Sequence, residues 1–370
     1  MTSVVFIRSN PVNPDVRVEK EVTSLSQHGY SIKIIAWDRK SSTDSLGETP
    51  TGIPIIRFGI KAPLGVKVVL YWIIWWIRVF NWLMRNDWDV VHAADFDCYI
   101  PALLAAKLKQ RKIIYDIYDF MPGRLPLPKA IYIIFRNTDL FFMRFADSII
   151  IVDDCRYEQM NLSRDDNKVS VIYNSPVDIY DKNNVNTSTG NNVTIFYGGV
   201  ISPHRDVLSM LHIARDMPNV SVGIAGGGNK EIIASIKSFS SNYENIEYYG
   251  ILPYNEVLIH TMNANILFAL YDPSTNNNKY SSPNKLFESM MLGKPIIMNS
   301  GIAAADIVQN HECGIIVEYG KYESLKNAVR YSLNPDVREK LGNNGRIAYE
   351  KYYSWTVMEK RLLRIYENFN

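Results

Sequence analysis

The chain has 370 residues and 47% of them are apolar, so it can bury two hydrophobic cores and two domains are expected. With 40 basic and 38 acidic residues the net charge is +2, which argues against a nucleic-acid groove or an acidic tail. The three cysteines, Cys98, Cys155 and Cys313, are far apart without a metal-binding spacing, so we expect reduced thiols in the cytoplasm.

Short β-branched runs alternate with longer stretches of helical period, which is typical of a parallel sheet covered by helices. The predicted fold class is therefore α/β. The first half of the chain contains the predicted strands 4–7, 32–36, 90–91, 112–116 and 148–152. The second half contains 194–197, 220–225, 246–249, 266–270 and 295–298. Met1 to Ile7 is too short for a signal peptide and continues into the first strand, which again favours the cytoplasm.

Residues 66–85 are unusually rich in tryptophan, with Trp72, Trp75, Trp76 and Trp82. On a helix of about 3.6 residues per turn, the few polar side chains fall on one narrow stripe. These are Lys67, Arg78, Asn81 and Arg85. Two interpretations stay open: a helix buried beside the sheet, or a helix lying on the inner face of the cytoplasmic membrane.

The run 181–192 consists of Asn, Thr, Ser and Gly with almost no apolar content, so it cannot contribute to a core. We predict a linker at 177–192 between an N-terminal Rossmann-like domain, 1–176, and a C-terminal one, 193–352. The final stretch, 353–370, has helical period and is expected to pack back on the first domain.

The segment Ser281-Ser-Pro-Asn-Lys-Leu-Phe-Glu-Ser-Met-Met-Leu-Gly-Lys-Pro predicts a short helix with defined ends. Ser282 suits the N-cap, Pro283 the first helical position and Gly293 the C-terminal stop. Because the helix follows a strand and an Asn-rich loop, its N-terminus is expected at the carboxyl edge of the sheet. Free N–H groups there favour an anion such as a diphosphate.

Three polar residues of this helix, Asn284, Lys285 and Glu288, share one face. We expect Glu288 to accept two ribose hydroxyls while Lys285 stays near phosphate. The alternative is a capped surface helix with an ordinary Lys/Glu pair.

The same segment resembles the nucleotide-sugar motif of the retaining family 4 glycosyltransferases, in the branch with Ser-Pro-Asn-Lys-Leu-Phe-Glu. Further resemblances lie in Asn13-Pro-Asp-Val-Arg-Val-Glu-Lys-Glu, Val91-His-Ala-Ala-Asp-Phe-Asp, Tyr115-Asp-Ile-Tyr-Asp, Tyr197-Gly-Gly-Val and Tyr353-Ser-Trp. That family has the GT-B fold, two Rossmann-like domains facing each other across a cleft. The resemblance implies a hexosyltransferase that moves a sugar from a nucleotide-sugar donor to a lipid-linked or polysaccharide acceptor, with retention, in cell-surface glycan synthesis.

The resemblance also implies roles for single residues. Arg205 and the helix N-terminus would stabilise the leaving diphosphate, and the donor would lie against Gly199, Ser281, Ser282, Asn284, Lys285 and Glu288. His92 would donate a hydrogen bond beside the transferred sugar, or is a satisfied core histidine. Asp95 and Asp119 would orient or deprotonate the acceptor hydroxyl, or simply cap helices.

Several positions depart from the family pattern. Tyr280 stands where a second glutamate is common, Gly199 replaces one member of a basic pair, and Ala94 replaces a second histidine. Asp95-Phe-Asp97 spells a metal-binding Asp-x-Asp pattern of another glycosyltransferase fold, but two carboxylates are weak evidence and we expect no metal and no cofactor. A sugar-nucleotide epimerase or phosphorylase of the same fold, or a non-catalytic nucleotide-sugar-binding subunit, remain as alternatives.

Overall fold

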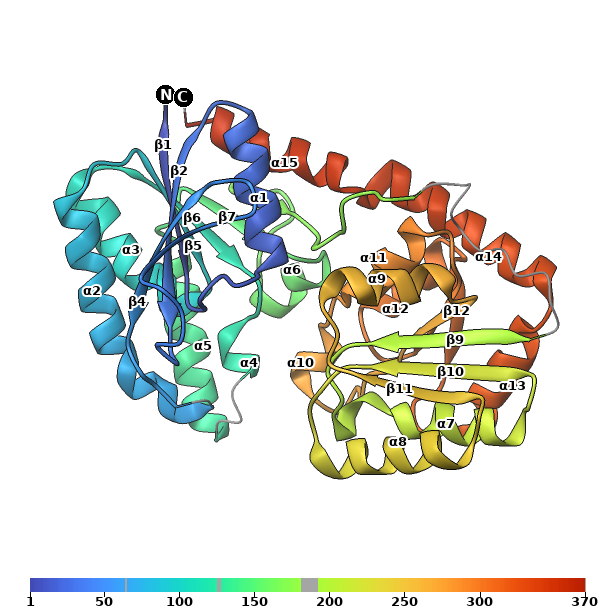
Figure 1. Cartoon of the computed structure of the whole chain (residues 1–370). Helices are drawn as coiled ribbons and strands as arrows, with labels where there is room; N and C mark the ends of the chain where they lie inside the picture. The colour runs from blue at the N-terminus through green and yellow to red at the C-terminus, as the bar shows by residue number, and fades with distance from the viewer. Residues whose placement is uncertain (64, 125–127, 181–191, 370) are drawn as a thin grey trace. The chain divides into compact units, whose positions relative to one another are not determined.

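The computed structural model of the chain describes residues 1–63, 65–124, 128–180 and 192–369 (Figure 1). The chain forms two compact units. The N-terminal unit is Met1–Tyr173 with Glu359–Asn370, and the C-terminal unit is Asn174–Met358. Most of the predicted linker lies outside the described residues.

The N-terminal unit is built on an eight-stranded sheet in the order β3-β4-β2-β1-β5-β6-β7-β8. All neighbours are parallel except β3 and β4, which pair antiparallel. The strands are β1 (Ser3–Arg8), β2 (Ser31–Asp38), β3 (Leu46–Glu48), β4 (Pro54–Gly59), β5 (Val90–Ala94), β6 (Lys112–Ile117), β7 (Ser148–Ile151) and β8 (Val169–Val171).

Helices cover both faces of this sheet because successive strand residues point to opposite sides. Val5, Val91 and Ala93 face a core shared with α2, α3 and α5, whereas Phe6 and His92 lie on the other face, toward α15. The helices of the unit are α1 (Val16–Gln27), the 3-10 turn η1 (Val66–Tyr71), α2 (Trp72–Arg85), α3 (Phe96–Lys109), α4 (Met121–Arg124), α5 (Lys129–Met143) and α6 (Cys155–Met160).

The C-terminal unit has a six-stranded, fully parallel sheet in the order β11-β10-β9-β12-β13-β14. Its strands are β9 (Val193–Gly198), β10 (Val220–Ala225), β11 (Ile246–Gly250), β12 (Ile266–Ala269), β13 (Ile296–Asn299) and β14 (Gly314–Val317). Its helices are η2 (Pro203–Arg205), α7 (Val207–Asp216), α8 (Lys230–Asn242), α9 (Tyr254–Asn263), α10 (Asn276–Lys279), α11 (Asn284–Met291), α12 (Ala304–Asn310), α13 (Tyr322–Ser332), α14 (Pro335–Ala348) and the π-helical η3 (Tyr349–Tyr353).

The final helix, α15 (Trp355–Glu367), carries the chain from the C-terminal unit back to the N-terminal one. The sequence placed these boundaries at residues 176 and 353, whereas the structure divides the chain after Tyr173 and after Met358. Contacts explain both differences. Tyr349 donates to the carbonyl of Pro176 at 2.8 Å, and the ring of Tyr353 packs on Phe287, so these segments belong to the C-terminal unit.

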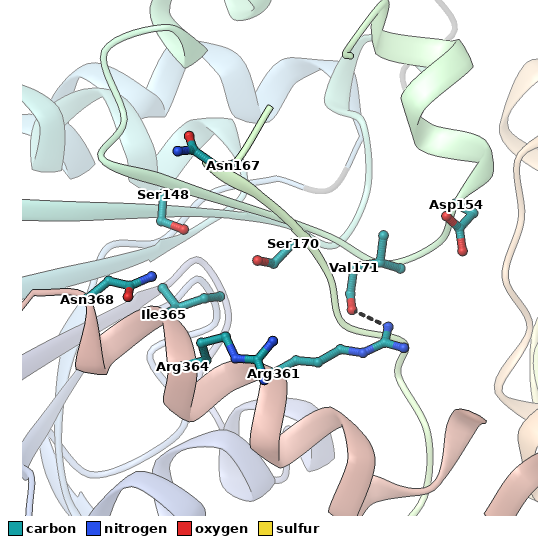
Figure 2. Close-up of a pocket in the computed structure, with 9 residues that line it drawn as sticks. All are labelled: Ser148, Asp154, Asn167, Ser170, Val171, Arg361, Arg364, Ile365 and Asn368. Carbon is teal, nitrogen blue, oxygen red and sulfur yellow. Dashed lines mark hydrogen bonds between the residues drawn. The ribbon is translucent and has the colours of Figure 1, made fainter. Parts of the chain in front are cut away.

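In the N-terminal unit α15 lies beside the edge strand β8 (Figure 2). Arg361 donates to the carbonyl of Val171 at 2.9 Å, which satisfies part of an otherwise open strand edge. A polar groove of about 390 Å³ runs between strand and helix, lined by Ser148, Asn167, Ser170 and Arg364 among others. The groove is thus formed where α15 packs beside β8.

Each of the predicted strands coincides with an observed one, and β3, β4, β8 and β14 are additional. The donor-motif helix was predicted nearly correctly. It begins at Asn284 with Pro283 as its N-cap residue, so the prediction of Ser282 as N-cap was wrong by one position. Its end is as predicted: Gly293 has φ +62°, and the N–H of Lys294 bonds to the carbonyl of Ser289 in a Schellman arrangement.

Residues Val66–Arg85 form the helical stretch η1–α2, which among the described residues is long and apolar enough to cross a membrane by length and composition. The polar stripe of Lys67, Arg78, Asn81 and Arg85 is exposed, but another face is packed into the core. Val68, Trp72, Trp75, Val79 and Leu83 are all buried, and Trp75 stacks on Trp37 at 5.3 Å. Each fully buried large side chain contributes about 1.5–3 kcal/mol, so this face anchors the helix to the domain.

Helix α5 carries a buried acid, Asp139, under the sheet. Its Oδ1 accepts a hydrogen bond from the Tyr115 hydroxyl at 2.9 Å, and its buried Oδ2 has no hydrogen-bond partner in the described part of the chain. Burial raises the pKa of Asp139 to about 7. The folded protein therefore keeps the Asp139 carboxyl group protonated at pH values where the same group is ionised in the unfolded chain.

We expect Asp139→Asn to remove a pH-dependent part of the stability. Since the folded-state pKa is raised, the free energy of unfolding falls as pH rises from about 4 to 7, by at most roughly 1.4 kcal/mol per pH unit. Asparagine keeps an oxygen for Tyr115 and has no proton to lose. Urea unfolding across this pH range measures the difference, with the exposed Asp87→Asn as control. Parallel pH profiles for wild type and Asp139→Asn would contradict the assignment.

Candidate functional site

The C-terminal sheet reverses its strand order beside β9, because β10 lies on one side of it and β12 on the other. Loops that leave the carboxyl ends of two such strands diverge, and ligands of open α/β sheets bind in the space between them. Here the loops after β9 and β12 are tied together. His204 pairs with Asp272 at 2.9 Å, and Arg205 donates to the Asn278 side chain at 2.7 Å.

Glycine residues allow the turns at this edge to approach closely. A Cβ on Gly226 would lie 1.8 Å from the Gly199 carbonyl oxygen, and one on Gly228 would lie 1.9 Å from that of Ile201. A Cβ on Gly199 would lie 2.6 Å from the Lys285 ammonium, at a φ of +157° that already disfavours a side chain. Gly199 therefore makes room for a cation, and the Gly226–Gly228 turn packs against the backbone of Gly199 and Ile201.

Two predicted cations, Arg205 and Lys285, lie at this edge over tyrosine rings. The Arg205 guanidinium is 3.7 Å from the Tyr271 ring centroid, and the Lys285 ammonium is 4.4 Å from that of Tyr197. In the described part of the chain, the hydrogen-bond and ring partners of these two cations are uncharged. Burial works against the charge of Lys285, yet the tyrosine oxygens and Glu288 outweigh it and raise its pKa.

Because neither Arg205 nor Lys285 forms a close ion pair with a carboxylate of the described residues, their charge is available to an anion such as a diphosphate. The aromatic faces stabilise the cations by the ring quadrupole, a weaker partner that a bound anion need not displace.

Glu288 is buried one turn further along α11. Its Oε1 accepts a hydrogen bond from the Tyr254 hydroxyl of α9 at 3.1 Å. The carboxylate is thus held by a neighbouring helix, so its orientation is fixed before any ligand binds.

The remaining predicted donor residues lie at the start of α11. Asn284 is exposed and accepts from the Asn174 side chain at 3.0 Å. The Ser281 N–H donates to the Asn278 carbonyl, and the Ser282 Oγ is buried with no hydrogen-bond partner among the described residues. The structure therefore gathers Gly199, Arg205, Ser281, Ser282, Asn284, Lys285 and Glu288 around one edge of the C-terminal unit.

The N-terminal sheet has its own reversal between β1 and β5, and Asp95 lies at it. Its Oδ2 pairs with Arg8 at 2.6 Å, and its Oδ1 accepts from the N–H groups of Tyr118 and Asp119. Asp95 is 1% exposed, has φ +67°, and burial raises its pKa to about 6. Asp95 is the N-cap residue of α3, as the simpler of the two interpretations has it, but its side chain makes no capping hydrogen bond there and accepts from the loop after β6 instead.

His92 is fully buried, and both ring nitrogens have partners. Nδ1 lies 2.8 Å from the Tyr366 hydroxyl and Nε2 lies 3.2 Å from Asp116. Burial lowers its pKa, so the ring is neutral near pH 7. This environment favours the core-histidine interpretation over a contact with sugar. Asp119 is half-buried in the loop after β6, next to Asp95.

One group in the described residues has metal-binding atoms close together: Glu21, His92 and Asp116, within 4.8 Å. Arg17 already pairs with both carboxylates, at 3.1 Å each. Asp97 of the Asp-x-Asp pattern lies 3.7 Å from Arg39, while Asp95 pairs with Arg8. Each of these four carboxylates therefore already has a guanidinium partner.

Sequence reasoning missed four contributors to these sites: Arg8, Tyr254, Tyr271 and Asn278. Arg8 ends the first strand, a position typical of ligand-binding residues, so its position carried a usable signal. The other three act through contacts with residues far away in sequence, which spacing alone does not show.

Solved structures show which fold these two units define. The structure is similar to sucrose-phosphate synthase from Thermosynechococcus elongatus, with a TM-score of 0.79 at 14% identity, covering 100% of this chain and 99% of that one. It is also similar to the Anabaena protein HepE in complex with UDP-glucose, with a TM-score of 0.74 at 12% identity, covering 100% of both chains. The chain has the GT-B fold of glycosyltransferases, as predicted.

Comparisons with known sequences narrow the class of glycosyltransferase further. Residues 179–348 match the family model described as "Glycosyl transferases group 1", so this part of the chain is a group 1 glycosyltransferase domain. The capsular polysaccharide biosynthesis glycosyltransferase CapM of Staphylococcus aureus is 27% identical over 163 residues. That match covers 38% of this chain and 43% of CapM, so the chain spans less than half the length of this curated relative.

Proposed function

We propose that the protein is a retaining glycosyltransferase that takes a hexosyl group from a nucleotide sugar bound at the carboxyl edge of the C-terminal sheet. The observation that carries the proposal is the pair Arg205 and Lys285, held over tyrosine rings and, among the described residues, not in a close ion pair with a carboxylate. These cations lie beside the N-terminus of α11, which also favours an anion.

The residues of this edge fit the separate parts of a nucleotide sugar. Arg205, positioned by Asn278, stabilises the charge that develops on the leaving diphosphate, and Lys285 neutralises its other oxygens. Glu288 accepts the ribose hydroxyls, with Tyr254 fixing its orientation. HepE was solved with UDP-glucose, which supports a uridine nucleotide sugar as the first donor to test.

The acceptor is proposed to be a lipid-linked sugar or a polysaccharide in cell-surface glycan synthesis, in the cytoplasm. The similarity to a capsular polysaccharide glycosyltransferase supports this class. Asp95 and Asp119, at the β1/β5 reversal, are proposed to orient the acceptor hydroxyl. The raised pKa of Asp95, about 6, suits a group that accepts a proton near neutral pH. His92 is proposed to act indirectly, by fixing the strand beside them.

Three other activities remain as alternatives: an epimerase, a phosphorylase and a non-catalytic nucleotide-sugar-binding subunit. The shared fold does not separate them from a transferase. An epimerase changes the donor sugar without an acceptor, so analysis of the products separates it from a transferase.

The test of the donor site is a thermal-shift panel of UDP-, GDP-, ADP- and CDP-sugars. A ligand at about 100 times its dissociation constant stabilises the folded protein by about 2.7 kcal/mol. We expect one nucleotide class to raise the melting temperature of the wild type and to lose this effect in Arg205→Ala and Glu288→Ala. Arg215→Ala, at a surface position in the same unit, is the control and retains the shift.

In the transfer assay, Arg205→Ala is expected to lower kcat by about 10²–10³-fold, since it removes one donor to the leaving group. A folded wild-type protein that responds to none of the nucleotides would overturn the site.

Tyr254→Phe tests how Glu288 is held. Loss of one hydrogen bond to the carboxylate is expected to weaken donor binding by about 3–10-fold. Because Glu288 is assigned to the ribose, the variant also loses preference for a ribonucleotide over its 2′-deoxy analogue. Tyr322→Phe is the matched control, because its hydroxyl also donates to a carboxylate, Asp216, at 2.8 Å. Calorimetric titration measures both variants, and an unchanged ribose preference in Tyr254→Phe would refute the assignment.

Transfer is proposed to need no divalent metal and no cofactor. Arg205, Lys285 and the N-terminus of α11 would supply the positive charge that a metal gives to a diphosphate. The carboxylates Asp95, Asp97, Asp116 and Glu21 already pair with arginines. We therefore expect full activity after EDTA treatment, and unchanged activity in Asp97→Asn, measured as sugar transferred per unit time. Activity lost to EDTA and restored by Mn²⁺ would overturn the proposal.

A further inference from the structure

Three helices form one continuous layer on the same face of the N-terminal sheet: η1–α2, α3 and α5 (Figure 1). The Tyr99 hydroxyl of α3 donates to the carbonyl of Phe142 in α5 at 2.9 Å. Trp72 of α2 packs on Phe135 of α5 with ring centroids 5.9 Å apart. The outer sides of the three helices are therefore neighbouring parts of one surface, the three-helix face.

Large apolar side chains project outward from every helix of this face. Leu70, Ile73 and Ile77 of η1–α2 are 75%, 62% and 55% exposed. Leu104 and Leu108 of α3, and Ile134 of α5, are more than half exposed as well. These side chains are additional to the apolar residues that the same helices bury, so the core does not explain them. Exposed apolar residues gathered on one surface mark an interaction site.

The charges on the three-helix face have a single sign. Helix η1–α2 contains no acidic residue, and the acids of α3 and α5, Asp97 and Asp139, are 1% and 0% exposed. The charged side chains that remain toward solvent on these helices are cationic: Lys67, Arg78, Arg85, Lys107, Lys109 and Lys129. The surface thus combines exposed aliphatic groups with positive charge alone.

We infer that the three-helix face binds an anionic lipid surface. Exposed aliphatic side chains insert at the level of the headgroups, and lysine and arginine contact lipid phosphates. The helices lie along the surface and do not cross it, because Trp75, Val79 and Leu83 of the most apolar helix are fully buried in the domain core. The inference rests on these helices and not on the proposed transferase chemistry.

This inference extends the expectation from residues 66–85 in two ways. Only the outward half of that helix is available for lipid, since the inward half forms the core. The lipid-facing surface also includes α3 and α5, whose exposed apolar residues were not singled out by the sequence. A lipid surface is favoured over a protein partner because the face offers no exposed carboxylate for mixed charge pairing at an interface rim.

The test is co-sedimentation of the full-length protein with vesicles of phosphatidylcholine alone, or of phosphatidylcholine and phosphatidylglycerol in equal amounts. We expect binding to the anionic vesicles that is at least about tenfold tighter than to the neutral ones and weakens with added salt. Ile73→Glu is expected to weaken it by at least about tenfold. Ile347→Glu is the matched control, because Ile347 in α14 is also 62% exposed and lies in the other unit.

Arg78→Glu separates charge from insertion, since it is expected to weaken binding to anionic vesicles while binding to neutral ones stays the same. Equal binding by Ile73→Glu and Ile347→Glu would overturn the inference, as would a wild type that does not bind vesicles. Sedimentation velocity of the same samples shows whether Ile73→Glu dissolves an oligomer, which would reassign the face to protein contact and also overturn it. Nucleotide-sugar thermal shifts on each variant report the donor site independently.

Discussion

The reversal of strand order beside β9 is the constraint on which the chemistry of the C-terminal unit depends. Parallel strands send all their carboxyl ends to one edge, and the reversal makes two neighbouring loops leave that edge in opposite directions. Glycines at 226 and 228 then let the turn after β10 pack against the backbone of the turn after β9, and Gly199 leaves room for Lys285. Arg205 and Lys285 reach the remaining space with tyrosine rings beneath them. The order of the strands therefore determines where positive charge can gather, and contacts with the tyrosine rings fix the position of each cation.

The N-terminal unit has the same kind of reversal of strand order, but the cations near it are paired with carboxylates. Arg8 pairs with Asp15 and Asp95, and Arg17 pairs with Glu21 and Asp116, so the cations are already neutralised inside the domain. Removing one member of such a buried pair leaves an uncompensated charge, which is costly. The N-terminal edge is thus suited to holding a neutral hydroxyl compound, and the C-terminal edge to holding an anion.

Much of this arrangement could be predicted from the sequence, because it follows from local rules. Periodicity located the central strands, whereas three of the four missed strands, β3, β8 and β14, lie at the edge of a sheet and the fourth, β4, lies next to one. Gly293 ended α11 as predicted, since a residue with positive φ is required there. The environment of His92 was beyond such rules, because its partner Tyr366 lies 274 residues away. Tyr254 and Asn278 were missed for the same reason: their roles exist only once separate elements have packed together.

The return of α15 to the N-terminal unit has a consequence for the order of events during synthesis. The C-terminal unit is one continuous stretch of chain, so it has all its parts as soon as that stretch has left the ribosome. The N-terminal unit is made first but lacks the helix that covers β8 and supplies the hydroxyl partner of His92 until α15 has also been made. The unit whose synthesis starts first therefore has all its parts only after the C-terminal unit has been made.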